Sequence, residues 1–366
     1  MDRRTLLHAV SAAALASSLP SCAVPVQGPA LPGAGLQDNS ALPPWPARLT
    51  QIAFGSCIDQ KKAQPIWDAI LAGRPDLFIF GGDTVYASTQ PWLLDNLQKA
   101  YSTQAAQPGF ARLRQTVAHL AIWDDHDFGL NDGGADFPHK LASKQAFMDF
   151  WKLRQDDPRR AREGLYHAQI FGPPGQQVQV ILLDERWFRS KLRVTDQRDA
   201  PGKERYLPDP NPAKTMLGPD QWRWLEAQLL QSADLRLIVS GVQVIVQGHG
   251  WEGWANFPAE QSRLLDLIER TQAKGVVFLS GDRHIGALYR HERAKHYPLF
   301  ELTSSGMTHA WAGASEAGPN RMGELVTQNH FALVELDWPA RHIALTLKGS
   351  AGQVLQRHRI ALAELD

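Results

Sequence analysis

The chain has 366 residues, of which 43% are hydrophobic and 21% are charged, and its 38 lysines and arginines balance its 38 aspartates and glutamates. This length and composition are typical of one large or two modest globular domains. Because the formal charge is zero, the sequence gives no electrostatic case for binding to nucleic acid or to an anionic membrane surface.

The first segment, residues 1–22, is predicted to be an export signal. A twin-arginine pair, Arg3 and Arg4, precedes an apolar, alanine-rich stretch over residues 6–19, which is short for a membrane span. Signals of this type direct folded proteins out of the bacterial cytoplasm. We therefore expect a periplasmic or cell-envelope protein that has the twin-arginine export machinery as a partner.

The sequence "LPSC" at the end of this signal resembles a lipobox, in which Cys22 would become the lipid-anchored first residue of a lipoprotein. Pro20 is unusual in that motif, so cleavage into the periplasm without a lipid stays an alternative. Residues 23–46 are rich in Pro, Gly and Ala and have the composition of a linker. We expect one folded domain over residues 47–366.

From residue 49 onward, apolar segments of strand length alternate with segments of helix length. Strands are predicted at 49–54, 76–80, 116–123, 177–184, 235–241 and 275–281, and helices at 63–73, 91–102, 143–153, 218–232 and 258–272. Later runs, predicted as antiparallel strands that complete a sheet, are 298–304, 331–338, 342–348 and 354–362. This alternation predicts an α/β layered fold. The charged, proline-bearing stretch 188–216 is predicted to be an excursion loop that shapes a substrate cleft.

Polar side chains follow five of the predicted strands directly. In α/β sheets, ligands bind beyond the carboxyl ends of the strands. The residues at these five positions are Cys57, then Asp83 and Tyr86, then Asp124 to Asp127 with His126 among them, then His249, and finally Asp282 and His284. Thiol, carboxylate, phenol and imidazole are all metal-ligating groups, so the five positions together predict a metal site.

Each of these residues alone has an ordinary interpretation. Cys57 and Tyr86 would be core residues, Asp83 would cap the following helix, and His249 would be a loop histidine. Asp282 and His284 lie two positions apart after an apolar strand, a spacing that points both side chains the same way. The joint occurrence favours the metal site over the separate explanations.

The mixture of ligands also indicates which metals are suited to the site. Thiolate, phenolate and imidazole suit an oxidised ion such as Fe(III), with Zn(II) as an alternative. The neighbouring carboxylates suit a harder ion, Ca(II), Mg(II) or Mn(II). Asp83 falls between the two sets and is placed to bridge them. A pair of metals of this kind clamps a phosphoryl group and ionises a bound water.

Five motifs resemble those of the PhoD-like (alkaline phosphatase D) branch of the metallophosphatases. They are "FGSC", "GGDTVY", "WDDHDFGLND", "SGDRH" and "TSSGMTH", in the family's order, from Phe54 to His309. The resemblance implies a four-layer α/β/β/α sandwich in which two mixed sheets pack together, with metals at one sheet edge. It also implies a phosphomonoesterase or phosphodiesterase that uses Fe(III) with Ca(II).

The resemblance further implies a role for each matched residue. The iron ligands would be Cys57, Asp83, Tyr86 and His284, and Asp83 would bridge to a second metal held with Asp125 and Asp282. His126 stands where ordinary metallophosphatases carry the histidine of Gly-Asn-His-Asp/Glu, so it would contact the phosphate and protonate the leaving group.

Other residues near the motifs are weaker candidates. Arg283 would stabilise charge on the phosphoryl oxygens, with a surface residue as the alternative, and Asn131 would contact substrate or orient its loop. His249, Trp251 and Trp254 would bind substrate, the two indoles as flat apolar surface for a leaving group; core anchoring is their alternative. Well-known family members carry an extra N-terminal β-rich domain, which we do not expect here, so the active site is expected to be more open.

Two other classes of protein share the same ligands. A nuclease or phosphotriesterase with Zn(II) or Mn(II) would use the same metal chemistry, and a non-catalytic metal-binding lipoprotein would retain the ligands without hydrolysing any ester. A cysteine nucleophile is disfavoured because the usual phosphate-cradling loop is missing around Cys57. The favoured partner is a small phosphate ester.

Overall fold

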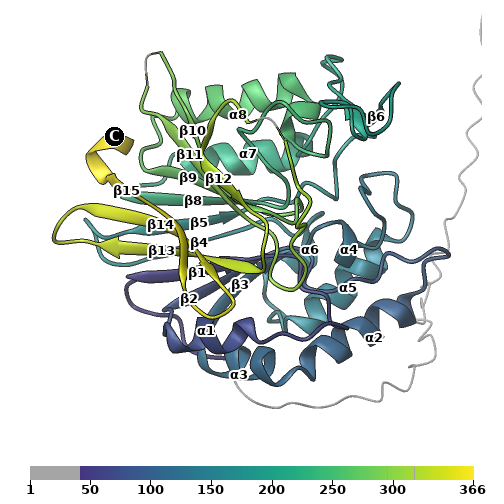
Figure 1. The fold of residues 1–366 in the computed structure, drawn as a ribbon, viewed down its shortest axis with the longest axis horizontal. Coiled ribbons are helices and arrows are strands. Elements are labelled where there is room, and N and C mark those ends of the chain that lie inside the picture. Colours follow the sequence, from purple (N-terminus) through teal and green to yellow (C-terminus); the bar gives the residue numbers. More distant parts are fainter. Residues whose placement is uncertain (1–41, 295, 317) are drawn as a thin grey trace, which may run out of the picture. The chain divides into compact units, whose positions relative to one another are not determined.

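The computed structural model describes residues 42–366 except 295 and 317 (Figure 1). The predicted export signal and lipobox, and most of the linker predicted over 23–46, therefore lie outside the described residues. Among the helices that are described, none has the length and apolar character needed to cross a membrane.

The first sheet has six strands in the order β15-β14-β13-β1-β2-β3. Strands β1, β2 and β3 run parallel, and β13 joins β1 in the antiparallel sense. Their bounds are β1 Gln51–Gly55, β2 Leu77–Gly81, β3 Ala118–Ile122, β13 His330–Asp337, β14 His342–Gly349 and β15 Val354–Ala361. The three parallel strands thus bring three carboxyl ends to one edge of this sheet.

The second sheet has seven strands in the order β12-β10-β11-β9-β8-β5-β4. Strands β5, β8, β9 and β11 run parallel to one another. The bounds are β4 His167–Phe171, β5 Val178–Leu182, β8 Leu235–Ser240, β9 Val276–Ser280, β10 Gly286–His291, β11 Leu299–Ser304 and β12 Arg321–Val326. A separate two-stranded ribbon pairs β6 (Arg193–Val194) with β7 (Tyr206–Leu207).

Helices cover the outer faces of the two sheets (Figure 1). Beside the first sheet lie α1 Ile66–Ala72, α2 Leu94–Ala105, α3 Pro108–Thr116 and α5 Lys140–Phe150, and against the second lie α7 Gly218–Leu229 and α8 Pro258–Arg270. The remaining short helices are α4 Asp125–Phe128, α6 Pro158–Ala161 and the 3-10 turns Trp254–Asn256 and Leu362–Leu365. The predicted four-layer α/β/β/α sandwich is confirmed.

The pleat of β9 shows why both faces of its sheet are apolar. Val277 and Leu279 belong to the core between the sheets, whereas Val276 and Phe278 pack with residues of α7 and α8. Successive side chains of a strand point to opposite faces. A strand covered on both sides is therefore buried throughout, as all five residues of "VVFLS" are, and four of them are apolar.

Several predicted elements differ from the structure. α3 was not predicted because it buries only Phe110 and Leu113, too few residues for a clear helical period. α2 starts at Leu94 rather than Pro91, since Leu93 is still extended at φ −132°. β11, predicted to be antiparallel, pairs antiparallel with β10 but parallel with β9. The edge strand β12 was not predicted because it is too exposed to show an apolar pattern. The excursion loop 188–216 contains the β6–β7 ribbon.

Candidate metal centre

The predicted ligands lie just beyond the carboxyl ends of strands from both sheets. Cys57 follows β1, Asp83 follows β2 and Asp125 follows β3 in the first sheet, while Asp282 and His284 follow β9 in the second. The two sheets therefore contribute side chains to one shared site.

Four of these residues have an unusual backbone conformation. Cys57, Asp83, Asp282 and His284 have positive φ values of 61°, 48°, 68° and 54°. Few residues other than glycine adopt this left-handed region, and such strain clusters at functional sites. Here the sharp turn after each strand directs the side chain into the site instead of along the sheet.

Two glycines allow the strand ends to approach closely. A Cβ atom on Gly281 would lie 2.6 Å from Ser56 Oγ, and one on Gly82, whose φ is +100°, would lie 2.4 Å from the Cβ of Asp124. Distances below 3.0 Å cannot be accommodated without movement of the neighbouring loops. The glycines in "GGD" and "SGD" therefore let loops from both sheets meet.

The first group of ligands is formed by Cys57, Asp83, Tyr86 and His284. The Cys57 Sγ lies 3.6 Å from Asp83 Oδ2, and the Tyr86 hydroxyl donates to the same oxygen at 3.2 Å. The Tyr86 hydroxyl also lies 3.1 Å from Nε2 of His284. Ligand atoms of Cys57, Asp83 and His284 all lie within 4.8 Å of one another, a spacing that suits a metal ion.

Two further groups continue from the first. Asp83, Asp125 and His126 form one, and Asp125, Asp132, Glu252 and Asp282 form the other, each with ligand atoms within 4.8 Å. Asp83 and Asp125 each belong to two of these groups. The site is thus a connected series of ligands, with sulfur and phenol oxygen at one end and carboxylates at the other.

The electrostatics of this series favour a bound cation. Burial, together with repulsion from Asp125 and neighbouring carboxylates, raises the pKa of Asp83 well above its usual value. Burial and nearby carboxylates also raise the pKa of Asp282 to about 7 and that of Asp132 to about 8. Burial raises the pKa of Cys57, and Asp83 adds to this effect. A metal ion would reverse each shift, because it stabilises the anionic form of its ligands.

The hydrogen bonds of the Asp125 carboxylate also favour a bound cation. Oδ1 of Asp125 is buried without a hydrogen-bond partner among the described residues. Oδ2 of the same carboxylate accepts from the backbone N–H of Asp132 at 2.7 Å. A buried carboxylate oxygen is rarely left without a partner. The residues present therefore fit a metal ion in donor type, spacing and charge.

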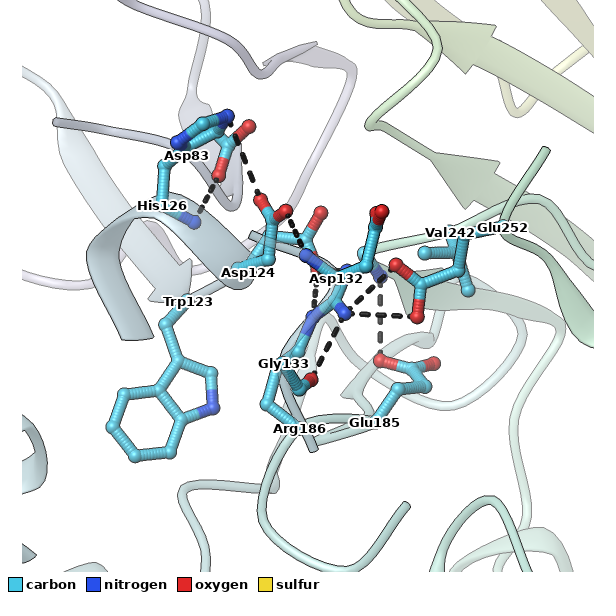
Figure 2. Close-up of polar contacts among 12 residues, drawn as sticks. Asp83, Trp123, Asp124, His126, Asp132, Gly133, Glu185, Arg186, Val242 and Glu252 are labelled. Carbon is cyan, nitrogen blue, oxygen red and sulfur yellow. Dashed lines mark hydrogen bonds and ion pairs between the residues drawn. The ribbon is translucent and has the colours of Figure 1, made fainter. Parts of the chain in front are cut away.

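Two buried arginines hold the carboxylate end in place, and Figure 2 shows the first of them, Arg186. Arg186 lies 2.6 Å from Asp124 and donates from Nη1 to Glu252 at 2.9 Å. Nε of Arg189 lies 2.9 Å from the same Glu252 carboxylate, and its Nη2 donates to the Gly133 carbonyl oxygen at 2.7 Å. These contacts fix the orientation of Glu252 and of the loop that carries Asp132.

His126 lies between the ligand series and solvent. Its Nδ1 is 2.6 Å from the Ser88 hydroxyl, its Nε2 is 3.9 Å from Asp125 Oδ1, and its ring lies 4.1 Å from that of Tyr86 between centroids. The backbone N–H of His126 donates to Asp83 Oδ1 at 3.1 Å (Figure 2). The imidazole is therefore oriented by a hydroxyl on one side and lies beside the carboxylates on the other.

A cleft of about 530 Å³ opens over the carboxylate end. It is lined by Asp125, His126, Asn131, Asp132, Arg198, Arg205, Tyr206, Trp251, Glu252, Asp282, Arg283, His284 and Trp311. Of the weaker candidates, Asn131, Arg283 and Trp251 thus lie at the cleft. Asn131 donates to Asp132 Oδ2 at 2.9 Å, and Arg283 forms a buried ion pair with Glu316 at 2.7 Å.

The other two candidates lie behind the cleft wall. Trp254 is fully buried, packs edge-on against Trp222 and donates its indole N–H to Ser240 at 3.2 Å. His249 uses Nε2 for a 2.9 Å contact with Gln243, and its Nδ1 accepts from the backbone N–H of Trp251. Burial, with Arg283 nearby, lowers the pKa of His249 to about 3. The contacts of His249 support the segment that carries Trp251.

Sequence reasoning missed Asp132, Glu252 and Tyr206. Asp132 ends the "GLND" stretch of the third motif, and Glu252 lies in "GHGWEGW" between two candidate tryptophans. Tyr206, on the β6–β7 ribbon, donates to Asp132 Oδ2 at 2.6 Å. No strand precedes these residues directly, so the rule of strand carboxyl ends did not select them.

Two packed mixed sheets that present metal ligands at their carboxyl ends define a metallophosphatase-type protein. The sequence model of the PhoD-like phosphatases matches residues 52–333, and the chain belongs to this family.

Known proteins agree with this assignment. The chain is 25% identical to alkaline phosphatase D of Bacillus subtilis (strain 168) over 194 residues, which are 46% of the chain and 32% of that relative. It thus matches about a third of the relative's length. The solved structure of PhoD superposes with a TM-score of 0.67 at 16% identity, covering 86% of this chain and 68% of that one. A purple acid phosphatase from yellow lupin (Lupinus luteus) gives 0.60 at 12% identity, covering 87% and 55%. These two likenesses show the fold.

Proposed function

We propose that the protein is an exported, metal-dependent phosphoester hydrolase that acts on phosphate monoesters or diesters. The observation that carries the proposal is the connected series of ligand groups, linked through Asp83 and Asp125, with His126 beside it at an open cleft. Membership of a phosphatase family supports the reaction class.

The two ends of the series suit different metals. Cys57, Asp83, Tyr86 and His284 would hold Fe(III), because thiolate, phenolate and imidazole favour an oxidised transition ion. Asp125 and Asp282, with Asp83 as the bridge, would hold Ca(II), because they offer carboxylate oxygens. Asp132 and Glu252 extend the carboxylate set. Zn(II), Mn(II) and Mg(II) are the alternatives that metal analysis separates.

The bound metals would supply positive charge for the phosphoryl oxygens and lower the pKa of a water. The remaining roles fall to side chains of the protein. His126 is held through Nδ1 by Ser88, which leaves Nε2 to donate a proton to the departing oxygen. The carboxylate of Asp125 lies 3.9 Å from this nitrogen. Asn131 at the cleft would contact the substrate, and Arg283 would act on the phosphoryl charge through its field, since its Nη2 is paired with Glu316.

Purified protein should be tested with a phosphate monoester, a diester and a triester that share the p-nitrophenol leaving group, alongside metal analysis. We expect hydrolysis of the monoester or the diester, abolished by Asp83→Asn and retained by Asp68→Asn, which changes an exposed residue of α1. Hydrolysis of the triester alone would indicate a phosphotriesterase, and cleavage of nucleic acid in preference to small esters would indicate a nuclease. Bound metal without hydrolysis of any ester would indicate a non-catalytic metal-binding protein and overturn the proposal.

Export is supported by the twin-arginine pair and the apolar stretch that follows it. The periplasm or cell envelope is therefore the proposed location, with a lipid anchor at Cys22 as an additional proposal. Replacement of Arg3 and Arg4 by lysine should leave the full-length protein in the cytoplasm. Unchanged fractionation of that variant would contradict export by this route.

A further inference from the structure

The excursion over residues 188–216 returns to the cleft. Three of its residues, Arg198, Arg205 and Tyr206, line the cleft together with the carboxylates of the metal centre. Tyr206 anchors the excursion through its hydrogen bond to Asp132. A segment far from the five motifs in sequence thus forms one wall of the cleft, and this wall carries two arginines.

Contacts on two sides position Arg205. Its guanidinium carbon lies 4.7 Å from the centroid of the Trp251 ring, and its Nη1 forms an ion pair with Asp199 and donates to the Glu204 carbonyl oxygen at 3.1 Å. The side chain is 27% exposed. Among the described residues, every hydrogen bond from this guanidinium uses Nη1, so the N–H groups of Nε and Nη2 remain available to a ligand.

The three arginines at the cleft differ in how far neighbouring carboxylates neutralise their positive charge. Arg283 also lies 4.7 Å from the Trp251 centroid, but its ion pair with Glu316 is buried on both sides and neutralises it. Arg198 and Arg205 share the single carboxylate of Asp199, which is 66% exposed. Solvent-exposed ion pairs of this kind are weak. The carboxylate of Glu204, the other acidic group beside Arg205, accepts from the backbone N–H groups of Gly202 and Gly250. The two arginines at the cleft wall therefore have only the exposed Asp199 as an ion-pair partner.

The indole that supports Arg205 is itself held by contacts on two sides. Trp251 contacts Trp311 edge-on, with centroids 5.7 Å apart and planes at 79°. Its backbone N–H donates to Nδ1 of the half-buried His249. A guanidinium held on an aromatic face is pre-organised to bind a carboxylate or phosphate.

We propose that Arg205, supported by Trp251 and assisted by Arg198, forms an anion subsite on the leaving-group side of the metal centre. The preferred substrates are phosphate esters whose alcohol part carries a second anionic group, such as a carboxylate or another phosphate. This inference rests on the proposed phosphoester hydrolase activity and names its substrate class.

The test compares two matched esters, phenyl phosphate and 4-carboxyphenyl phosphate. For each protein, kcat/KM for 4-carboxyphenyl phosphate is divided by kcat/KM for phenyl phosphate. This ratio is compared between the metal-loaded wild-type protein and Arg205→Gln, so that the intrinsic difference in reactivity between the leaving groups cancels. We expect Arg205→Gln to lower the ratio about tenfold, because a charge-assisted contact is lost, and mainly through KM. Arg198→Gln should lower it by a smaller factor. Arg205→Lys, which keeps the charge, should restore part of the preference.

Arg193→Gln provides the matched control. Arg193 lies on β6 of the same excursion, is exposed and does not line the cleft, so both esters should be hydrolysed as by the wild type. Equal losses on both esters in Arg205→Gln would mean a structural effect and would overturn the inference. If Arg205→Gln does not fold, the wild-type ratio decides: it should fall as salt rises, and a ratio independent of salt overturns the subsite. Failure to hydrolyse either ester by any variant, wild type included, would overturn the proposed function instead.

Discussion

The hydroxyl oxygen of Tyr86 lies 3.1 Å from Nε2 of His284, although the two residues follow strands of different sheets. Tyr86 comes after β2 and His284 comes after β9. The contact joins the two halves of the sandwich at the end of the ligand series that carries the thiol and the phenol. Packing of the sheets and assembly of the centre are therefore linked.

Tyr86→Phe should remove a spectroscopic signal. If the phenolate binds Fe(III), the protein as isolated absorbs visible light through charge transfer from phenolate to iron, and the variant loses this band. Cys57, Asp83 and His284 remain as ligands, so part of the iron should be retained. Absorption spectra and metal analysis of both proteins check this. A colourless, active wild-type protein without iron would exclude the assignment.

Asp83→Ala should lose bound metal and activity together, because the carboxylate belongs to two ligand groups. In chelator-treated protein the same change should raise the melting temperature, since it removes a buried carboxylate whose pKa is raised by burial and by repulsion from Asp125. Metal analysis and thermal unfolding with and without chelator measure the two effects. Metal content at the wild-type level would argue against a bridging ligand.

His126→Ala should lower kcat by about a hundredfold or more, the usual effect of removing a proton donor, while metal content stays near normal. Ser88→Ala is the matched variant, because it removes only the group 2.6 Å from Nδ1 and should have a smaller effect. Esters with good leaving groups should be less affected than alkyl esters, which need the proton more. Loss of metal in His126→Ala would instead make His126 a ligand.

His330 should make folding stability depend on pH. The side chain is fully buried beside Gly286 and Gly306, and burial lowers its pKa from 6.5 to about 4. Between these values the unfolded chain binds a proton that the folded protein does not. This group therefore destabilises the fold progressively as the pH falls from about 6.5 to about 4, and it has no effect above that window.

The comparison uses the free energy of unfolding of the wild type and His330→Gln in urea at pH 7.5, 6.5, 5.5 and 4.5. The glutamine amide can keep the 2.8 Å contact to the Gln328 carbonyl oxygen but does not titrate. The variant should lose stability less steeply, by up to about 1.4 kcal/mol per pH unit for one proton. The values at pH 7.5 give the reference for each protein. If the free energy of unfolding of both proteins depended equally on pH below 6.5, the effect would be refuted.

The sequence by itself predicted the layered fold and most of the ligand series. Apolar runs such as "DLFIF" and "VVFLS" end abruptly in polar residues, and this local pattern identifies strands whose carboxyl ends carry Asp83 and Asp282. Strands of period two and helices of period 3.6 are local properties. They were therefore visible without any knowledge of how the two sheets pack.

Only the tertiary structure determined which of the remaining polar residues meet. Glu252 joins the carboxylates because Arg186 and Arg189 hold it there, and Arg205 reaches the cleft because the excursion folds back onto Trp251. Trp254, three residues from Trp251, lies in the core instead. Such placements depend on contacts between segments 40 or more residues apart, such as Arg186 with Glu252. A local sequence pattern cannot predict these contacts. They are determined in the folded sandwich by close-packed side chains and paired buried charges.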